Sequence, residues 1–228
     1  MKFRAAVRLL RVSPCIFLMG CRLLGLSGSN TGEGPERVYP LFFQPDVGLA
    51  HEMEVSLTQR LYISNHDIFY QEGPKYYPVL VHGAPKIVGL SDNRQCLAFI
   101  EPAVFEQVGN LYIFDFTKKS LRPLTQNEPD SQTSVKDAKW KDGRLYYIEG
   151  FALGTQSEGG SLYWVDHDGI QRRLLYDEHG EDGTAMEVVA FEFAPNGSLR
   201  LTLRSSGHAG NGKERVVYID ANGDVLKR

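Results

Sequence analysis

Three glutamates and an arginine hold matching places along the chain, and their types make them the first candidates for chemistry. The glutamates close the apolar runs "IFYQEG", "LAFIEP" and "LYYIEG", where they are Glu72, Glu101 and Glu149. The corresponding run "LTLRSS" carries Arg204 at this place. Carboxylates near tyrosines suit a cation, a sugar or a basic partner. The same pattern fits solvated strand ends without a function, and both interpretations remain open.

Catalytic and metal-binding patterns are missing from the sequence. Paired carboxylates hydrolyse glycosides only at defined separations, which a sequence does not supply. The six histidines are scattered, without the spacing of a zinc site. No serine lies in a G-x-S-x-G elbow and no G-x-x-x-x-G-K-[ST] phosphate loop occurs. We therefore predict no catalytic residue, no metal site and no cofactor.

The elements that must position these residues recur along the chain. "NLYIFDF", "SLYWVDHDG" and "RVVYIDANGD" share a strand-like run that ends at an aspartate, and these are Asp115, Asp166 and Asp220. Each aspartate is expected to accept backbone N–H groups of the turn that follows. The starts "DHDG" and "DANGD" resemble a calcium loop, but the glutamate at its last position is absent.

Each repeat reads as short antiparallel strands joined by tight turns. Two predicted strands precede each aspartate strand and meet at the polar turns Asp92-Asn93, Asp142-Gly143 and Asn196-Gly197. A further hairpin follows each aspartate. Many strands are apolar on both faces, as a sheet packed between two neighbours requires. The chain is therefore predicted to be all-β, a small or incomplete β-propeller of about four antiparallel four-stranded blades.

The first blade is expected to be degenerate and to lack a clear outer strand. It begins at "RLYIS", with a turn at Asn65-His66 and a third strand from Tyr76. The repeat pattern resembles the TolB-like and WD40-like propeller repeats of bacterial envelope proteins, through "SDNRQCLAFI", "NLYIFDF" and "LRPLT". The chain is also similar to small bacterial lipoproteins of unknown function. TolB-like propellers usually have more blades, so this propeller is small, open, or completed by a second chain.

The N-terminus looks like a secretion signal of the lipoprotein type. A basic start precedes a short apolar run, too short to span a membrane, and residues 1–20 are read as the signal peptide. "LMGC" resembles the bacterial lipobox, which implies a lipid on Cys21. A signal cleaved elsewhere and an organellar transit peptide remain alternatives. Residues 21–37 are read as a flexible tether and 38–228 as the β domain. Cys96 is expected to be a buried apolar residue.

Function is predicted only as a class. With a formal net charge of −3, the chain shows no concentrated basic face for a nucleic acid. We expect a bacterial, extracytoplasmic binding module, held at the membrane through Cys21. Its loop-rich face, with Glu72, Glu101, Glu149 and Arg204 at the rim, would meet an envelope protein, peptide or glycan. The alternatives are a secreted enzyme acting on a glycan through the glutamates, and a structural subunit of an envelope complex.

Overall fold

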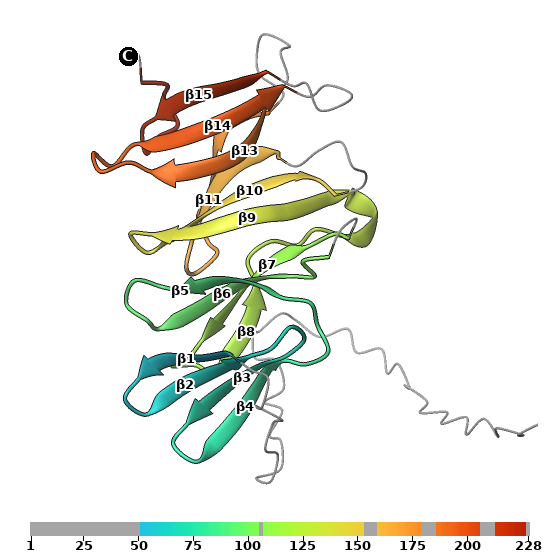
Figure 1. Ribbon diagram of the computed structural model, residues 1–228, viewed down its shortest axis with the longest axis vertical. Coiled ribbons are helices and arrows are strands. Elements are labelled where there is room, and N and C mark those ends of the chain that lie inside the picture. Colours follow the sequence, from blue (N-terminus) through green and yellow to red (C-terminus); the bar gives the residue numbers. More distant parts are fainter. Residues whose placement is uncertain (1–50, 105–106, 153–158, 179–185, 206–212, 227–228) are drawn as a thin grey trace, which may run out of the picture. The chain divides into compact units, whose positions relative to one another are not determined.

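The protein is all-β, as the sequence predicts (Figure 1). The computed structural model describes residues 51–104, 107–152, 159–178, 186–205 and 213–226. The predicted signal peptide, the lipidation residue Cys21 and the tether lie outside the described residues. Within these ranges the chain forms four antiparallel sheets and one short 3-10 helix, Pro129–Ser131. No helix in these ranges is both apolar enough and long enough to cross a membrane.

Each sheet is built from strands that follow one another in the chain. Sheet A contains β1 (His51–Ser56), β2 (Gln59–Ile63), β3 (Ile68–Glu72) and β4 (Lys75–Leu80). Sheet B contains β5 (Lys86–Leu90), β6 (Cys96–Glu101), β7 (Asn110–Asp115) and β8 (Ser120–Pro123). Sheet C contains β9 (Thr133–Lys141), β10 (Arg144–Phe151), β11 (Ser161–Asp166) and β12 (Arg172–Tyr176). Sheet D contains β13 (Met186–Phe193), β14 (Leu199–Ser205) and β15 (Glu214–Ile219).

The prediction of a degenerate first blade is wrong. Sheet A has four strands, because β1 precedes the segment that the sequence suggested as its start. The turn between β1 and β2 is Leu57-Thr58, which contains none of the residues that mark tight turns. The sheet with fewer strands is sheet D, which has three. There Val225 bridges Ile219 and begins to pair beside β15.

Three apolar cores hold neighbouring sheets together. The first lies between sheets A and B, the second between B and C, and the third between C and D. Strand β7 shows why its residues are apolar on both faces: Leu111 enters the B–C core and Phe114 enters the A–B core. No core joins sheet A to sheet D in the described part of the chain, so the four blades form an open series.

The predicted tight turns join the first and second strands of sheets B, C and D, and Asp142-Gly143 has the predicted turn geometry. Asp142 and Gly143 both have positive φ, as a two-residue hairpin turn requires. The carboxylate of Asp115 accepts the amides of Thr117 and Lys118 at 2.8 and 2.9 Å. Asp166 and Asp220 accept turn amides in the same way. Cys96 is buried, as expected.

The connections at the two ends of the strands differ in length. Here 'edge' in the names below means the side of the sheets on which one set of strand ends lies. Because the strands are antiparallel, every connection from a second to a third strand, and every connection to the next sheet, lies at one edge. We call this the loop edge; its connections are 64–67, 81–85, 102–109, 124–132, 152–160, 177–185 and 206–213. The opposite edge, the turn edge, carries short turns only, such as 57–58, 73–74 and 142–143 (Figure 1). The strand ends that flank the longest insertions therefore share one edge.

Candidate functional site

The structure gathers three of the four predicted rim residues at the loop edge. Glu101, Glu149 and Arg204 lie at or near the ends of the second strands of sheets B, C and D, opposite Asn110, Ser161 and Glu214 of the third strands. Glu72 instead ends the third strand of sheet A, which places it at the turn edge. The three glutamates therefore do not share one rim, and Glu72 has no place in a site with the others.

Glu72 fastens sheet A to sheet B at the turn edge. Its carboxylate pairs with Lys119 Nζ of the β7–β8 turn at 2.6 Å and accepts Gln59 Nε2 at 3.1 Å. The hydrogen bonds from Lys119 and Gln59 lower the pKa of Glu72 below its usual 4.5. The Glu72 carboxylate therefore has a structural role, which is to join sheet A to sheet B.

Glu72→Gln is expected to remove a small, pH-dependent part of the stability. A carboxyl group whose folded pKa is lowered stabilises above its unfolded pKa, and this contribution is lost as the pH falls below 4.5. Both side chains are about one-third exposed, so we expect about 0.5 kcal/mol. Urea unfolding at pH 7 and pH 3 measures it: the difference between wild type and variant should shrink at pH 3. An equal difference at both pH values would contradict the ion pair.

Glu101 and Glu149 perform the same structural task in adjacent sheets. Glu101 Oε2 accepts the amide of Ala84 at 2.8 Å, and Ala84 lies in the connection that enters sheet B. Glu149 Oε1 accepts Asn127 Nδ2 at 3.2 Å, and Asn127 lies in the connection that enters sheet C. Each glutamate thus holds the connection that leads into its own sheet. These carboxylates are hydrogen-bonded strand ends rather than simply solvated ones.

Glu149 is also the centre of a charged and aromatic cluster, which we call the Arg172 cluster: Asn127, Tyr147, Glu149, Tyr163 and Arg172. The Arg172 side chain extends from β12 to a charged hydrogen bond with Glu149 Oε2. On the way its guanidinium passes over the rings of Tyr163 and Tyr147, at 4.2 and 5.6 Å from their centres. Such cation–π contacts and the ion pair fix the guanidinium in place.

The two charges of this cluster differ in their access to water. The Glu149 side chain is 8% exposed, whereas that of Arg172 is 46% exposed. Although burial disfavours its charged form, the neighbouring Tyr147 and Glu149 raise the pKa of Arg172. Within the described part of the chain, Arg172 donates a hydrogen bond only to Glu149. Its remaining N–H donors therefore lie at the surface, while Glu149 and the two tyrosine rings fix the position of the guanidinium.

The Tyr147 hydroxyl is the unusual polar group of the cluster. It is buried without a hydrogen bond of regular geometry, and the guanidinium of Arg172, which lies over its ring, is the polar group that interacts with it. Burial raises the pKa of Tyr147 far above its ordinary value, so the phenol is neutral. A buried hydroxyl without a regular hydrogen bond costs stability, and a group retained at such a cost commonly serves a site. The hydroxyl is out of reach of the surface, whereas the half-exposed Arg172 above it has the chemistry to meet a carboxylate or a sugar hydroxyl.

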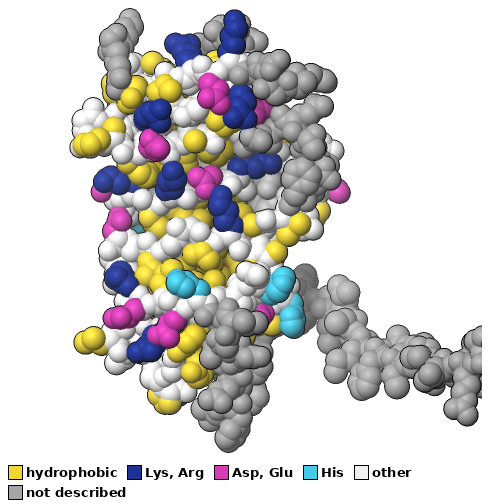
Figure 2. Space-filling view, viewed as in Figure 1, with side chains coloured by type: hydrophobic (Ala, Val, Ile, Leu, Met, Phe, Trp, Pro, Cys, Tyr) yellow, Lys and Arg dark blue, Asp and Glu magenta, His cyan; other side chains and the backbone are white. Residues whose placement is uncertain are grey.

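Arg204, the other predicted residue at the loop edge, forms an ordinary surface pair. Arg204 pairs with Glu214 at 3.0 Å, and both side chains are exposed. Figure 2 shows basic and acidic side chains interspersed over the visible face rather than gathered by sign. In the ranges that the structure describes, no group of His, Cys, Asp and Glu side chains has the arrangement of a metal site.

The sequence interpretation missed Arg172 and Asn127. Both lie outside the strand that carries Glu149, one on the outer strand of the sheet and one in a connection. Only the register of β10, β11 and β12 reveals that a side chain from Arg172 can reach along the sheet to Glu149.

Comparison with known proteins supports the fold. No family model matches the chain, and no curated protein matches it. Dipeptidyl peptidase 4 of Porphyromonas gingivalis matches with a TM-score of 0.53 and 12% identity, over 75% of this chain and 31% of that one. A prolyl endopeptidase matches with a TM-score of 0.51 and 13% identity, over 75% of this chain and 26% of that one.

A third solved structure is nearer to this chain in length. It is a protein of Clostridium novyi NT, provisionally assigned as a conserved lipoprotein, with a TM-score of 0.48 and 21% identity over 60% of this chain and 95% of that one. The chain spans only about a quarter to a third of the two peptidases. At these identities the likeness establishes the fold alone. The protein is an all-β protein with four blades of a small or incomplete propeller.

Proposed function

We propose that this protein is a lipid-anchored extracytoplasmic binding module whose loop edge meets an envelope protein, peptide or glycan. One observation carries this proposal: the connections between strands two and three, and between sheets, all lie at one edge of a rigid set of sheets. Variable connections on a rigid scaffold are where binding residues usually lie. The opposite edge, with its tight turns, offers little surface for a partner.

The Arg172 cluster would supply the polar recognition. Arg172 presents a positive charge and further donors, and the partly exposed ring of Tyr163 lies beside it, while Tyr147 supports the guanidinium from the buried side. A carboxylate attached to a sugar ring or to a peptide fits these groups, since guanidinium binds carboxylate through two parallel hydrogen bonds. The bound group would take donors of Arg172 that Glu149 leaves unused.

Titration with small acids tests this site. Glucuronate and N-acetylglutamate are added to the isotope-labelled full chain carrying Cys21→Ala, and glucose serves as the neutral comparison. The NMR signals of Tyr163, whose ring lies beside Arg172, should shift with the acids, less with glucose, and not in Arg172→Gln. The matched control is Arg60→Gln, which removes an exposed arginine paired with Glu52 on sheet A. Equal shifts in wild type and Arg172→Gln would contradict the proposal.

Tyr147→Phe is expected to raise stability. The substitution removes a buried hydroxyl without a regular hydrogen bond, so the free energy of unfolding should rise by about 1 kcal/mol. Thermal unfolding measures the effect. A loss of stability would show that the hydroxyl makes a regular hydrogen bond in the folded protein.

The membrane anchor is the part of the proposal that rests on sequence alone. The lipobox-like "LMGC" supports a lipid on Cys21, and residues 21–37 would tether the β domain to the membrane. Metabolic labelling with a fatty-acid analogue should mark the native protein, and Cys21→Ala should lose the label. Cys96→Ala is the matched control and should keep it, since Cys96 is buried. A label that survives Cys21→Ala would exclude this residue as the anchor.

A further inference from the structure

The outer edge of sheet D differs from those of the other three sheets. Sheets A, B and C each end in a fourth strand, β4, β8 or β12. Beside β15, pairing occurs only near its end: Val225 bridges Ile219, and the amide of Leu226 donates to the carbonyl of Tyr218 at 2.8 Å. The first half of β15 has no strand on this side within the described residues.

The backbone of Val216 is directed towards this open side. In an antiparallel ladder, alternate residues direct their N–H and C=O groups to opposite sides of the strand. The carbonyl of Tyr218 points away from β14, because it accepts Leu226, and Val216 lies two residues earlier on the same side. In the part of the chain that the structure describes, the amide and carbonyl of Val216 have no hydrogen-bond partner.

Most of the other sheet edges, those formed by the first strands and by β4 and β8, are protected against a further strand. Side chains of a neighbouring sheet donate to carbonyls of the first strands: Arg94 to Val55, Trp140 to Gly89, Lys86 to Lys136 and Lys139 to Phe191. The outer strands β4 and β8 contain Pro78 and Pro123, and prolines block pairing at an edge. Val216 has no such protection, which makes this stretch of β15 the natural place for strand addition.

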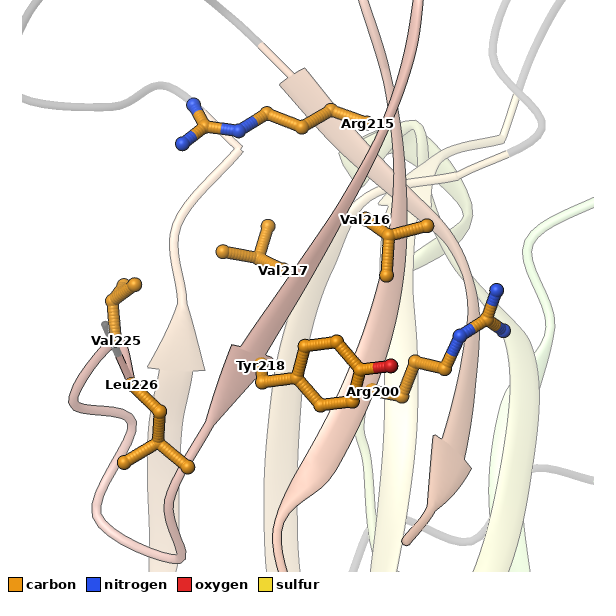
Figure 3. Close-up of a pocket in the computed structure, with 7 residues that line it drawn as sticks. All are labelled: Arg200, Arg215, Val216, Val217, Tyr218, Val225 and Leu226. Carbon is orange, nitrogen blue, oxygen red and sulfur yellow. The ribbon is translucent and has the colours of Figure 1, made fainter. Parts of the chain in front are cut away.

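A hollow of about 670 Å³ lies along the same edge. It is lined by Arg200, Arg215, Val216, Val217, Tyr218, Val225 and Leu226. Figure 3 shows the apolar side chains in the middle of this surface, with the two arginines farther apart. Val216 and Val225 are 44% and 55% exposed, so the apolar part of the hollow is open to a partner.

The charge of the hollow indicates the kind of partner. Arg215 makes no ion pair with any described residue, and Arg200 has only an exposed pair with Glu192 at 3.1 Å. Arg200 of β14 lies opposite Tyr218, and Arg215 lies three residues before Tyr218 on β15. Because side chains alternate between the two faces along a strand, the two arginines lie on opposite faces of sheet D. Successive residues of an added strand also alternate between faces, so carboxylates on both of its faces would each meet an arginine.

We propose that the first half of β15, with this hollow, is a strand-addition site for an extended acidic segment of a partner protein. The segment would become the fourth strand of sheet D, with backbone hydrogen bonds to Val216 and its carboxylates near Arg200 and Arg215. A second copy of this chain fits less well, because pairing through the same edge would bring two more arginines to the hollow. This site is separate from the Arg172 cluster and does not depend on it.

The test uses a designed probe, the fluorescein-labelled peptide TVEVVET, with the full chain carrying Cys21→Ala; its two glutamates are three residues apart and therefore lie on opposite faces of the added strand. A matched probe has N-methyl groups on alternate amides, which blocks strand pairing and leaves the charges in place. The unmethylated probe should bind and should protect the Val216 amide from hydrogen exchange, and the methylated probe should not. Val216→Pro and Arg215→Glu should each weaken binding by about fivefold or more. Arg60→Glu, on sheet A, should leave binding unchanged.

Val216→Pro is informative because it spares the fold. The amide that it removes points away from β14, so no ladder bond is lost. Equal binding of the two probes, or binding unaffected by both variants, would overturn the proposal. An unbound protein whose Val216 amide is already protected would also overturn it. Protection that rises with protein concentration would then assign the edge to a second copy, and protection independent of concentration would assign it to the chain itself.

Discussion

Glu149→Ala should lower the free energy of unfolding by about 2 kcal/mol. The Glu149 carboxylate is buried and accepts hydrogen bonds from Asn127 and Arg172. Removal of one partner from a buried charged pair leaves the other charge uncompensated, which is the costly way to break such a pair. Arg172 is half-exposed and can turn to water, so the loss should fall below that of a fully buried pair.

Chemical unfolding of three variants distinguishes the effect of the Glu149 charge from the effect of its hydrogen bond with Asn127. Glu149→Gln keeps an acceptor for Asn127 but loses the attraction to Arg172, so it should lie between wild type and Glu149→Ala. Glu214→Ala is the matched control, because its pair with Arg204 is exposed and should contribute little. Equal losses for Glu149→Ala and Glu214→Ala would show that the Arg172 cluster is no more than a surface ion pair.

The repeat pattern predicted most of the fold because turn chemistry is local. Asp142-Gly143 marks a hairpin in any context, since few residue pairs accept two positive φ angles in succession. Strand β1 was missed because Leu57-Thr58 carries no such signal, although Leu57 is 94% exposed in the turn. That single omission shifted the strand count of sheet A and moved Glu72 to the wrong edge.

The candidate site was predictable in position but not in composition. Glu101 and Glu149 lie near the loop edge, as the pattern predicts, because each follows a run of clear apolar pattern in its strand. Their partners come from connections and from an outer strand, and their contacts depend on register and on side-chain reach. A pattern of residue types does not encode either quantity. The buried hydroxyl of Tyr147 is likewise visible only once its surroundings are known.

Gly160→Ala is expected to disturb the same site from the backbone. Gly160 bridges Val188 of sheet D and also lies against the end of β10. A Cβ atom there would collide with the carbonyl of Glu149 and would come within 2.6 Å of Gly150 Cα. Backbone atoms cannot move aside as a flexible side chain can, so we expect a loss of about 3 kcal/mol.

Its control is Gly197→Ala, in the turn between β13 and β14. There a Cβ would meet nothing within 4 Å, and the only cost is the φ of +81°, about 1 kcal/mol. Because the clash at Gly160 falls on the residue that holds Arg172, Gly160→Ala should also alter the Arg172 side-chain NMR signal, whereas Gly197→Ala should not. Similar losses of stability for the two variants, with an unchanged Arg172 signal in both, would mean that the ends of β10 and β11 adapt without cost. The close packing of these strand ends would then have no part in holding Glu149 against Arg172.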